Sequence, residues 1–325
     1  EDSKIAKTSY QFNSPNYCVI SYPIDKIPDI QMFDKVLCIS PLSFENISNS
    51  NKTNYYENII KNHKKEITYL QSSLEKVKVG GICVYSTHSM SPFENEAVIN
   101  TVLNMDQFQN KFELVDCSMK YNEIKRKRGL ESWKLNELEK IISDKNEIKS
   151  FSSDSLISNI DYCMRFYPHQ INCSGTFIAV IKKVAETEKK LTQTIPDNVK
   201  ESKTSIKFSK LAQEMIQNII NDFELPTEIQ NITFVHSQQT NTESIYYITP
   251  QLMNALKDDY LQKLNICHLG TLTFLINSAY LIPFIPLVQN LPEIAKNPKK
   301  RYVTINVNDF EKLVEFKQIQ LDKNQ

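Results

Sequence analysis

The sequence predicts an α/β protein in which an incomplete sheet with helices is followed by a small α+β domain. Apolar, β-rich runs alternate with amphipathic segments in the first half, which is the order of a parallel α/β sheet. A polar stretch without apolar periodicity separates this half from a second set of strands and helices. We therefore expect one domain over residues 1–183, a linker over 184–205 and a second domain over 206–325.

The first elements are two short strands and a long helix. Residues Tyr17 to Ser21 and Phe33 to Ile39 are β-rich apolar runs and predict buried strands. Apolar residues at helical spacing then predict a helix from Asn54 to Lys78, and they are Ile59, Ile60, Ile67, Leu70, Leu74 and Val77. Gly80 and Gly81 follow as its C-terminal stop.

A strand from Ile82 to Thr87 leads into a second predicted helix. The order Ser91-Pro92-Phe93-Glu94 fits a capping box, so this helix is expected to begin at Ser91 and to reach about Leu103. A strand follows near Phe112 to Val115, and Gly175 to Ile181 gives the last strand of the domain.

The second half predicts a small α+β unit. Strands are expected at Ser244 to Thr249, Gly270 to Asn277 and Arg301 to Val307. Short helices are expected at Pro250 to Leu256 and Asn308 to Phe316.

Composition restricts the function classes. Lys+Arg and Asp+Glu both number 38, so nucleic-acid binding would need a local basic patch. The seven cysteines contain no CxxC pair, which favours free thiols in a reducing compartment over disulfides or zinc. With five glycines, the chain offers no loop for a nucleotide cofactor. We find no signal peptide or membrane-spanning apolar run, and we expect an intracellular protein without a membrane partner.

Three segments resemble the Nol/Nop/Sun family of RNA cytosine-5 methyltransferases. YSTHSMSPFENEAVI, from Tyr85 to Ile99, follows the signature Tyr-Ser-Thr-Cys-Ser-(Leu/Met)-x-Pro-x-Glu-(Asn/Asp)-Glu-x-Val. FDKVLCISPLS lies where the family has a strand ending in Asp-x-Pro-Cys-Ser. The closing segment matches at Arg165, Pro168, His169, Gly175, Phe177 and Ala179. GLESWKL and the region after residue 206 are similar to the tRNA-methylating branch, which implies a Rossmann-like methyltransferase sheet and a PUA-like domain.

The resemblance implies chemistry for which this chain lacks the reacting groups. In the family a cysteine thiolate adds to C6 of cytosine, so that C5 accepts the methyl group of S-adenosylmethionine. That cysteine aligns with His88, the second family cysteine with Leu42 and its companion aspartate with Ile39. Cys38 points to the opposite face of the strand from Ile39, so it is no substitute. We predict that these degenerate positions are not catalytic.

The resemblance also implies an open sheet and no cofactor. The family's glycine-rich cofactor loop and acidic residue align upstream of Tyr17, so no bound cofactor is expected. The strand from Phe33 to Ile39 would then lack its family neighbours and present unpaired backbone groups. Upstream residues, a shift of Tyr17 to Ser21 onto this edge, or a protein partner would cover it. We favour a partner or a rearrangement.

Three functions remain open. The first is a catalytically inactive relative that acts as a binding or structural subunit of a ribonucleoprotein or multiprotein complex. The alternative is a subunit of an active S-adenosylmethionine-dependent tRNA cytosine-5 methyltransferase whose cofactor half and nucleophile come from another chain. The third is a protein-interaction module without RNA contact, which the zero net charge favours.

Two basic runs favour contact with structured RNA, either tRNA or rRNA. The run Lys125, Arg126, Lys127 and Arg128 opens a charged insertion that reaches Ser155 and has helical pieces, and Lys299, Lys300 and Arg301 form the second run. The alternative for each run is a solvated loop. Trp133 lies near the first run and could stack on a base, although core packing is expected for it. Histidines such as His63 lack partners at ligand spacing, so no metal site is predicted.

Overall fold

The chain forms two compact units, each described here by itself. The computed structural model describes residues 14–27, 33–40, 52–120, 122–135, 138–187, 206–222, 233–239, 242–277, 280–283 and 312. One unit is Pro23–Ile195, and the other combines Glu1–Tyr22 with Pro196–Gln325. The described residues 14–22 therefore belong with the C-terminal half, whereas the sequence predicted one domain over 1–183.

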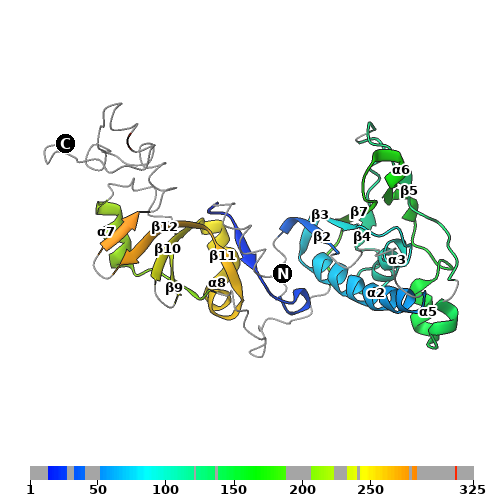
Figure 1. Ribbon diagram of the computed structural model, residues 1–325, viewed down its shortest axis with the longest axis horizontal. Helices are drawn as coiled ribbons and strands as arrows, with labels where there is room; N and C mark the ends of the chain where they lie inside the picture. Colours follow the sequence, from blue (N-terminus) through cyan, green and yellow to red (C-terminus); the bar gives the residue numbers. More distant parts are fainter. Residues whose placement is uncertain are drawn as a thin grey trace. The chain divides into compact units, whose positions relative to one another are not determined.

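A six-stranded mixed sheet organises the unit Pro23–Ile195 (Figure 1). Its order is β2 (Phe33–Ile39), β3 (Val77–Thr87), β7 (Thr176–Lys183), β6 (Met164–Phe166) and β5 (Lys127–Arg128), and β4 (Phe112–Leu114) also pairs with β7. Helix α2 (Lys52–Glu75) connects β2 to β3, which are parallel, while β7 runs antiparallel to β3. The predicted α/β class is confirmed, and the sheet is mixed where a parallel one was expected.

Helices α2 and α3 (Glu96–Leu103) cover one face of this sheet (Figure 1). The buried cluster on that face is formed by side chains of three strands and both helices, among them Cys38, Tyr85, Phe177, Leu70, Leu74, Val98 and Val102. Successive strand residues point to opposite faces, so Leu37, Val84 and Val180 lie on the other face. Short elements complete the unit: η2 (Ile24–Lys26), α4 (Leu138–Ile141), α5 (Lys145–Phe151), η3 (Ile160–Tyr162) and α6 (Pro168–Ile171).

The glycine pair lies inside a strand and does not stop a helix. Helix α2 ends at Glu75, before the expected end, and β3 already begins at Val77. Gly80 has a φ of +82°, and a Cβ on Gly81 would lie 2.9 Å from the carbonyl oxygen of Asp34 in β2. The pairing register of β2 and β3 shifts at this point. The pair therefore allows an irregularity where two backbones approach closely.

The capping box predicted at Ser91 to Glu94 does not form. Helix α3 begins at Glu96, and the residues before it form turns. The buried carboxylate of Glu94 accepts hydrogen bonds from Ser89 Oγ (2.5 Å) and from Asn62 Nδ2 (2.9 Å). These tertiary partners replace the local bond to the Ser91 N–H that a capping box requires.

The interdomain linker begins later than predicted. The Val184 N–H donates to the Lys111 carbonyl oxygen at 2.8 Å, and Thr187 is buried. Residues 184–187 therefore pack against the first unit. The remaining predicted linker residues, 188–205, lie outside the described residues.

The second unit is α+β, as predicted. Its antiparallel sheet has the order β13 (Tyr280–Pro283), β12 (Thr271–Asn277), β10 (Thr242–Ile248), β9 (Thr233–Gln239) and β8 (Phe208–Lys210). Helices α7 (Gln213–Asp222) and α8 (Pro250–Lys263) belong to the same unit. The expected strands at β10 and β12 and the helix starting at Pro250 are confirmed. The elements expected over 301–316 lie outside the described residues, apart from Lys312.

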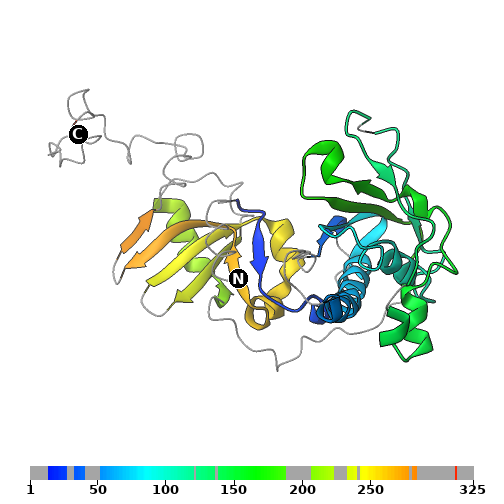
Figure 2. The same ribbon diagram turned by 45° about the vertical axis from the view of Figure 1, so that its right-hand side comes forward.

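The predicted strand at Tyr17 to Ser21 exists but belongs to this second unit. It is β1 (Cys18–Ile20), and it pairs antiparallel with β11 (Ile266–Leu269), as Figure 2 shows in blue and gold. The Gly270 N–H donates to the Tyr17 carbonyl oxygen at 2.7 Å. The expectation that this strand lies in the methyltransferase-like sheet is wrong, because β11 supplies its backbone partners. Among the described residues, β2 pairs with β3 alone.

Candidate functional site

The parallel strands β2 and β3 end side by side, and this edge carries two of the three degenerate positions. Ile39, the last residue of β2, pairs with Ser86, and His88 directly follows β3. Ligands of α/β sheets bind outside the carboxyl ends of strands, so this edge is the candidate site. Ile39 is 55% exposed, and His88 is also exposed. Leu42, the third position, lies outside the described residues.

A buried hydrogen-bond network fixes the loop that follows β3. Thr87 Oγ1 donates to Asn95 Oδ1 at 2.6 Å, and Asn95 Nδ2 donates to the Ser89 carbonyl oxygen at 2.9 Å. The Tyr85 hydroxyl donates to the Glu94 carbonyl oxygen at 2.8 Å. These groups are buried, so their mutual bonds replace those to water. None of these bonds uses the side chain of His88.

An ion pair between Glu96 and Arg165 connects α3 to β6 next to this loop. Both side chains are almost fully buried, at 0% and 1% exposure. Arg165 Nε and Nη2 donate to the two carboxylate oxygens at 2.7 and 2.5 Å, which is a bidentate arrangement. Burial lowers the pKa of Arg165, but the bonds and charge of Glu96 outweigh this and raise it. Arg165 Nη1 also donates to the Met90 carbonyl oxygen at 2.9 Å, so the pair holds the loop.

Glu66 and Ser40 form a second buried polar contact at the same edge. Ser40 Oγ donates to Glu66 Oε1 at 2.8 Å, and Glu66, on α2, is 0% exposed. Burial, with a smaller contribution from the charge of Glu94, raises the pKa of Glu66 to about 9. The carboxyl group is therefore protonated at neutral pH. The sequence analysis missed Glu66, although it lies four residues before the buried Leu70 on the apolar stripe of α2.

Three described thiols of this unit have buried or structural positions. Cys38 is 5% exposed on the helix-covered face, and burial raises its pKa. Burial likewise raises the pKa of Cys83. Cys173 has a structural position, because its Sγ accepts the Gly175 N–H at 3.3 Å. Since the thiolate is the reactive form, buried neutral thiols are poor nucleophiles.

The described residues do not fit S-adenosylmethionine, the cofactor that the resemblance implies. Gly80 and Gly81 lie at the amino end of β3, opposite to His88, whereas a cofactor loop follows the carboxyl end of a strand.

Within the described ranges, no three His, Cys, Asp or Glu side chains are grouped so that they could hold a metal ion. The helices of those ranges are too short or too polar to cross a membrane.

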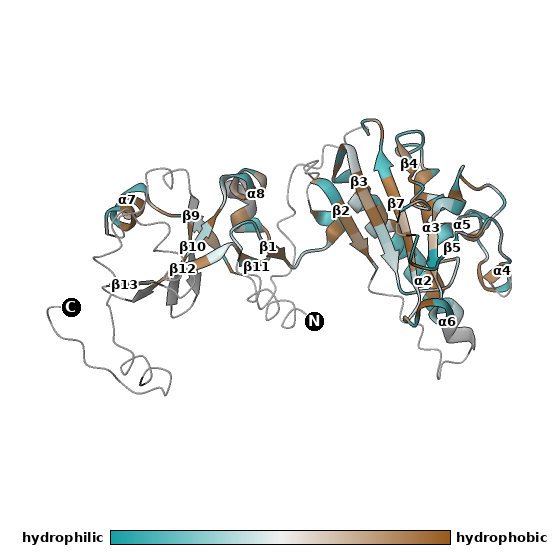
Figure 3. Cartoon of the chain, turned by 90° about the horizontal axis from the view of Figure 1, so that it is seen from above, coloured by the Kyte–Doolittle hydropathy of each residue, from teal (hydrophilic) through white to brown (hydrophobic). Residues whose placement is uncertain are grey.

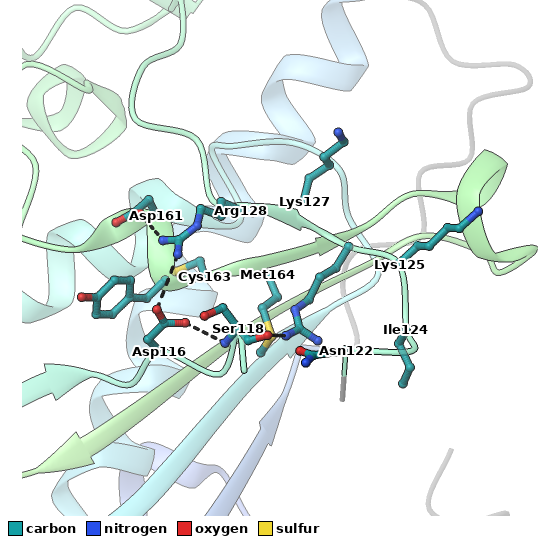
Figure 4. Close-up of a pocket in the computed structure, with 12 residues that line it drawn as sticks. Asp116, Ser118, Asn122, Ile124, Lys125, Lys127, Arg128, Asp161, Cys163 and Met164 are labelled. Atoms are coloured by element: carbon teal, nitrogen blue, oxygen red, sulfur yellow. Dashed lines mark hydrogen bonds and ion pairs between the residues drawn. The ribbon is translucent and has the colours of Figure 1, made fainter. Parts of the chain in front are cut away.

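The structure divides the first basic run into two arginines with internal partners and two exposed lysines. Arg126 Nη2 donates to the carbonyl oxygens of Cys117, Ser118 and Lys120 at 2.6, 2.7 and 2.9 Å. Arg126 therefore stabilises the loop between β4 and β5. Lys125 and Lys127 are exposed, as Figure 4 shows.

Arg128 forms ion pairs with two aspartates of the same unit. Its guanidinium group contacts Asp161 and lies 3.5 Å from Asp116 Oδ2. The guanidinium carbon is 5.8 Å from the centre of the Tyr162 ring. The second basic run, Lys299, Lys300 and Arg301, lies outside the described residues.

Two aromatic side chains have structural positions. Trp133 packs in a second apolar cluster, and its Nε1 donates to the Phe151 carbonyl oxygen at 2.7 Å, so the expected core packing is confirmed. The two ring nitrogens of His63 lie 2.6 Å from the Phe93 carbonyl oxygen and 3.1 Å from Ser150 Oγ. Burial lowers the pKa of His63 to about 4. A neutral His63 therefore connects α2 to the loop before α3.

The substitution Glu66→Gln should stabilise the protein increasingly as pH rises. When the pKa of a carboxyl group is higher in the folded state than in the unfolded chain, the unfolded chain releases the proton first as pH rises. The free energy of unfolding therefore decreases above the unfolded pKa. Glutamine does not titrate and can still accept the Ser40 bond. We expect the variant to gain about 1.4 kcal/mol on the wild type per pH unit between pH 6 and 8.

The measurement is denaturant unfolding of both proteins across this pH range. Glu57→Gln, an exposed change on the same helix, is the matched control and should give a pH-independent difference. A pH-independent difference for Glu66→Gln would show that Glu66 is ionised in the folded protein.

Comparison with known proteins agrees with the motifs at this edge. The family model for the 16S rRNA methyltransferase RsmB/F matches residues 3–182. The multisite-specific tRNA:(cytosine-C(5))-methyltransferase of Saccharomyces cerevisiae is 30% identical over 213 residues, which are 57% of this chain and 30% of that protein. The tRNA (cytosine(34)-C(5))-methyltransferase of Drosophila melanogaster is 28% identical over 173 residues, covering 47% of this chain and 23% of that protein.

Solved structures give a further similarity. A methyltransferase homologue from Pyrococcus horikoshii has 28% sequence identity and a TM-score of 0.33, and the match covers 46% of this chain and 39% of that one. The chain spans less than a third of the length of the two relatives named above. The RsmB/F model covers more than half of the 325 residues. The chain therefore belongs to this family of methyltransferases, the Nol/Nop/Sun group that its motifs resemble.

Proposed function

We propose that this chain is a catalytically inactive member of its family that acts as a binding or structural subunit of a ribonucleoprotein or multiprotein complex. The observation that carries the proposal is the exposure of His88 and Ile39 at the carboxyl edge, beside a loop whose buried bonds are complete. An imidazole is a weaker nucleophile than a thiolate, and Ile39 has no group that could hydrogen-bond a base.

Structured RNA is the proposed ligand of this subunit. The relatives are named as methyltransferases of tRNA, and one further relative, from Schizosaccharomyces pombe, as a 25S rRNA (cytosine-C(5))-methyltransferase. The exposed Lys125 and Lys127 offer charges that phosphates could neutralise. The second basic run, at residues 299–301, is proposed as an additional contact.

A partner protein is proposed to cover the sheet at β2. The run Val36-Leu37-Cys38-Ile39 is continuously apolar, which is typical of a strand covered on both faces. Cys38 is buried beneath α2, whereas Leu37 and Ile39 on the other face are 63% and 55% exposed. Figure 3 shows apolar residues in brown along β2 and β3. An exposed apolar edge strand favours addition of a partner strand beside β2, with apolar side chains on Leu37 and Ile39.

Methyl transfer tests the inactivity directly. The purified chain, incubated with labelled S-adenosylmethionine and tRNA, should incorporate no label above background, because no thiolate is available at position 88. The yeast relative is the positive control. Incorporation that is lost in His88→Ala would contradict the proposal and would assign His88 a catalytic role.

Charge placed on the open sheet face tests the partner. Leu37→Lys with Ile39→Lys should remove the tagged chain from its complex in the source cells, because a partner strand cannot bury two ammonium groups. Ile141→Lys, an exposed apolar position on α4, is the matched control and should leave the complex intact. The stoichiometry of the complex is measured by quantitative mass spectrometry. Wild-type stoichiometry for the double variant would exclude β2 as the interface.

A further inference from the structure

A polar pocket of about 330 Å³ opens between three segments of the first unit (Figure 4). Its walls come from the loop after β4, from β5 and the residues that lead into it, and from the segment that runs from η3 to the start of β6. Neither His88 nor Ile39 lines it. The pocket is therefore separate from the degenerate positions at the ends of β2 and β3.

The pocket lining has more positive than negative side chains, and its arginines and lysines play different parts. Its lining contains the four cations of the first basic run and two carboxylates, Asp116 and Asp161. Arg126 and Arg128 bind groups of the protein around the pocket, whereas Lys125 and Lys127 are exposed. Figure 4 shows the side chains of Lys125 and Lys127 extending away from Arg128. The lysines thus form a cationic rim.

Arg128 supplies a fixed planar surface inside this rim. Its side chain is 54% exposed although its guanidinium group pairs with Asp161 and Asp116. Bonds from the guanidinium nitrogens lie in the plane of the group and do not occupy its faces. The Tyr162 ring lies against it at 5.8 Å. A second planar group could stack on Arg128 without an entropic cost for ordering the arginine.

The remaining lining combines apolar and amide groups. Ile124 is 47% exposed, and Met164 lies in the pocket wall. Asn122 has both a donor and acceptors in its side chain. A planar, partly apolar ligand with polar edges and an attached phosphate matches this set. The volume lies at the lower end of the range for small-ligand pockets, about 300 to 1,000 Å³, and suits one nucleotide.

We infer that this pocket binds one unpaired nucleotide of an RNA, with the base stacked on Arg128 and the flanking phosphates at Lys125 and Lys127. Bases that are splayed out of single-stranded segments commonly stack on arginine planes, whereas a base held in a duplex cannot enter a pocket. The inference deepens the proposed function and depends on its RNA-binding part.

Fluorescence anisotropy with a labelled ten-nucleotide single strand of RNA and a blunt duplex of equal length tests this inference. Arg128→Lys keeps the charge and removes the planar surface. It should weaken binding of the single strand about tenfold, as expected for one lost stacking contact, and leave the duplex within about twofold. Equal effects on both RNAs would overturn the inference.

The rim is tested by Lys125→Glu with Lys127→Glu. This variant should weaken single-strand binding at least about tenfold and lower the slope of log affinity against log salt by about 1.4. Lys145→Glu with Lys149→Glu, two exposed lysines on α5, is the matched control and should leave both quantities unchanged. Thermal unfolding of each variant checks that the fold is intact.

The outcomes separate the pocket from the proposed function. If the pocket variants bind RNA as well as the wild type does, the inferred nucleotide pocket is wrong, while the proposed RNA-binding role is not contradicted. A wild-type chain that binds neither of these RNAs would overturn the pocket, and one that also fails to bind tRNA and rRNA would overturn the RNA-binding part of the proposal. An acidic peptide of the same net charge that displaces the labelled single strand as well as unlabelled RNA does would also overturn the inference. A general anion site would then explain the binding.

Discussion

The buried ion pair between Glu96 and Arg165 is the interaction on which the rest of the first unit depends. Two charges out of water are costly, so they are tolerated only when their hydrogen bonds are satisfied. Here Glu96 also accepts the Leu130 N–H at 2.9 Å, and Arg165 also binds the Met90 carbonyl oxygen. The pair therefore connects a helix, a strand and two loops at one point, and the loss of either partner would leave the other charge buried and unpaired.

The loop after β3 is held in the same way, by buried hydrogen bonds. The shape of the loop is held by Thr87, Ser89, Glu94 and Asn95, whose side chains bond one another. His88, within the same loop, is exposed. A substitution at this exposed position is expected to cost little folding energy, because surface changes away from buried contacts usually have small effects.

The sequence could predict those elements whose pattern is determined by burial alone. The strands at Phe33, Ile82 and Gly175 carry apolar residues that fit a covered sheet, and the structure has strands there. Positions decided by tertiary contacts were beyond it. The capping box at Ser91 does not form because the Glu94 carboxylate binds Asn62 on α2 and Ser89. The strand at Tyr17 pairs with β11 of the second unit. No local pattern reports such distant partners.

The candidate site was likewise only partly predictable from the sequence. The motifs around His88 and Arg165 were visible as strings of residues, but the role of Arg126 and Arg128 was not. A run of four basic residues gives no indication of which cations face inward, and the carboxylates of Asp116 and Asp161 that decide this come from distant segments. Glu66 illustrates the converse case, because an acidic residue on the apolar stripe of α2 is a signal that sequence alone contains.

The most direct test of the central role of the ion pair is native-state amide hydrogen exchange of Arg165→Met. The account predicts that β3, α3 and β6 together lose about 3 to 5 kcal/mol of opening free energy, because Glu96 stays buried without its partner. Lys182→Met, which removes the exposed pair with Glu113, is the control and should change it by less than about 1 kcal/mol. A loss of the control's size for Arg165→Met, or one confined to β6, would contradict the account.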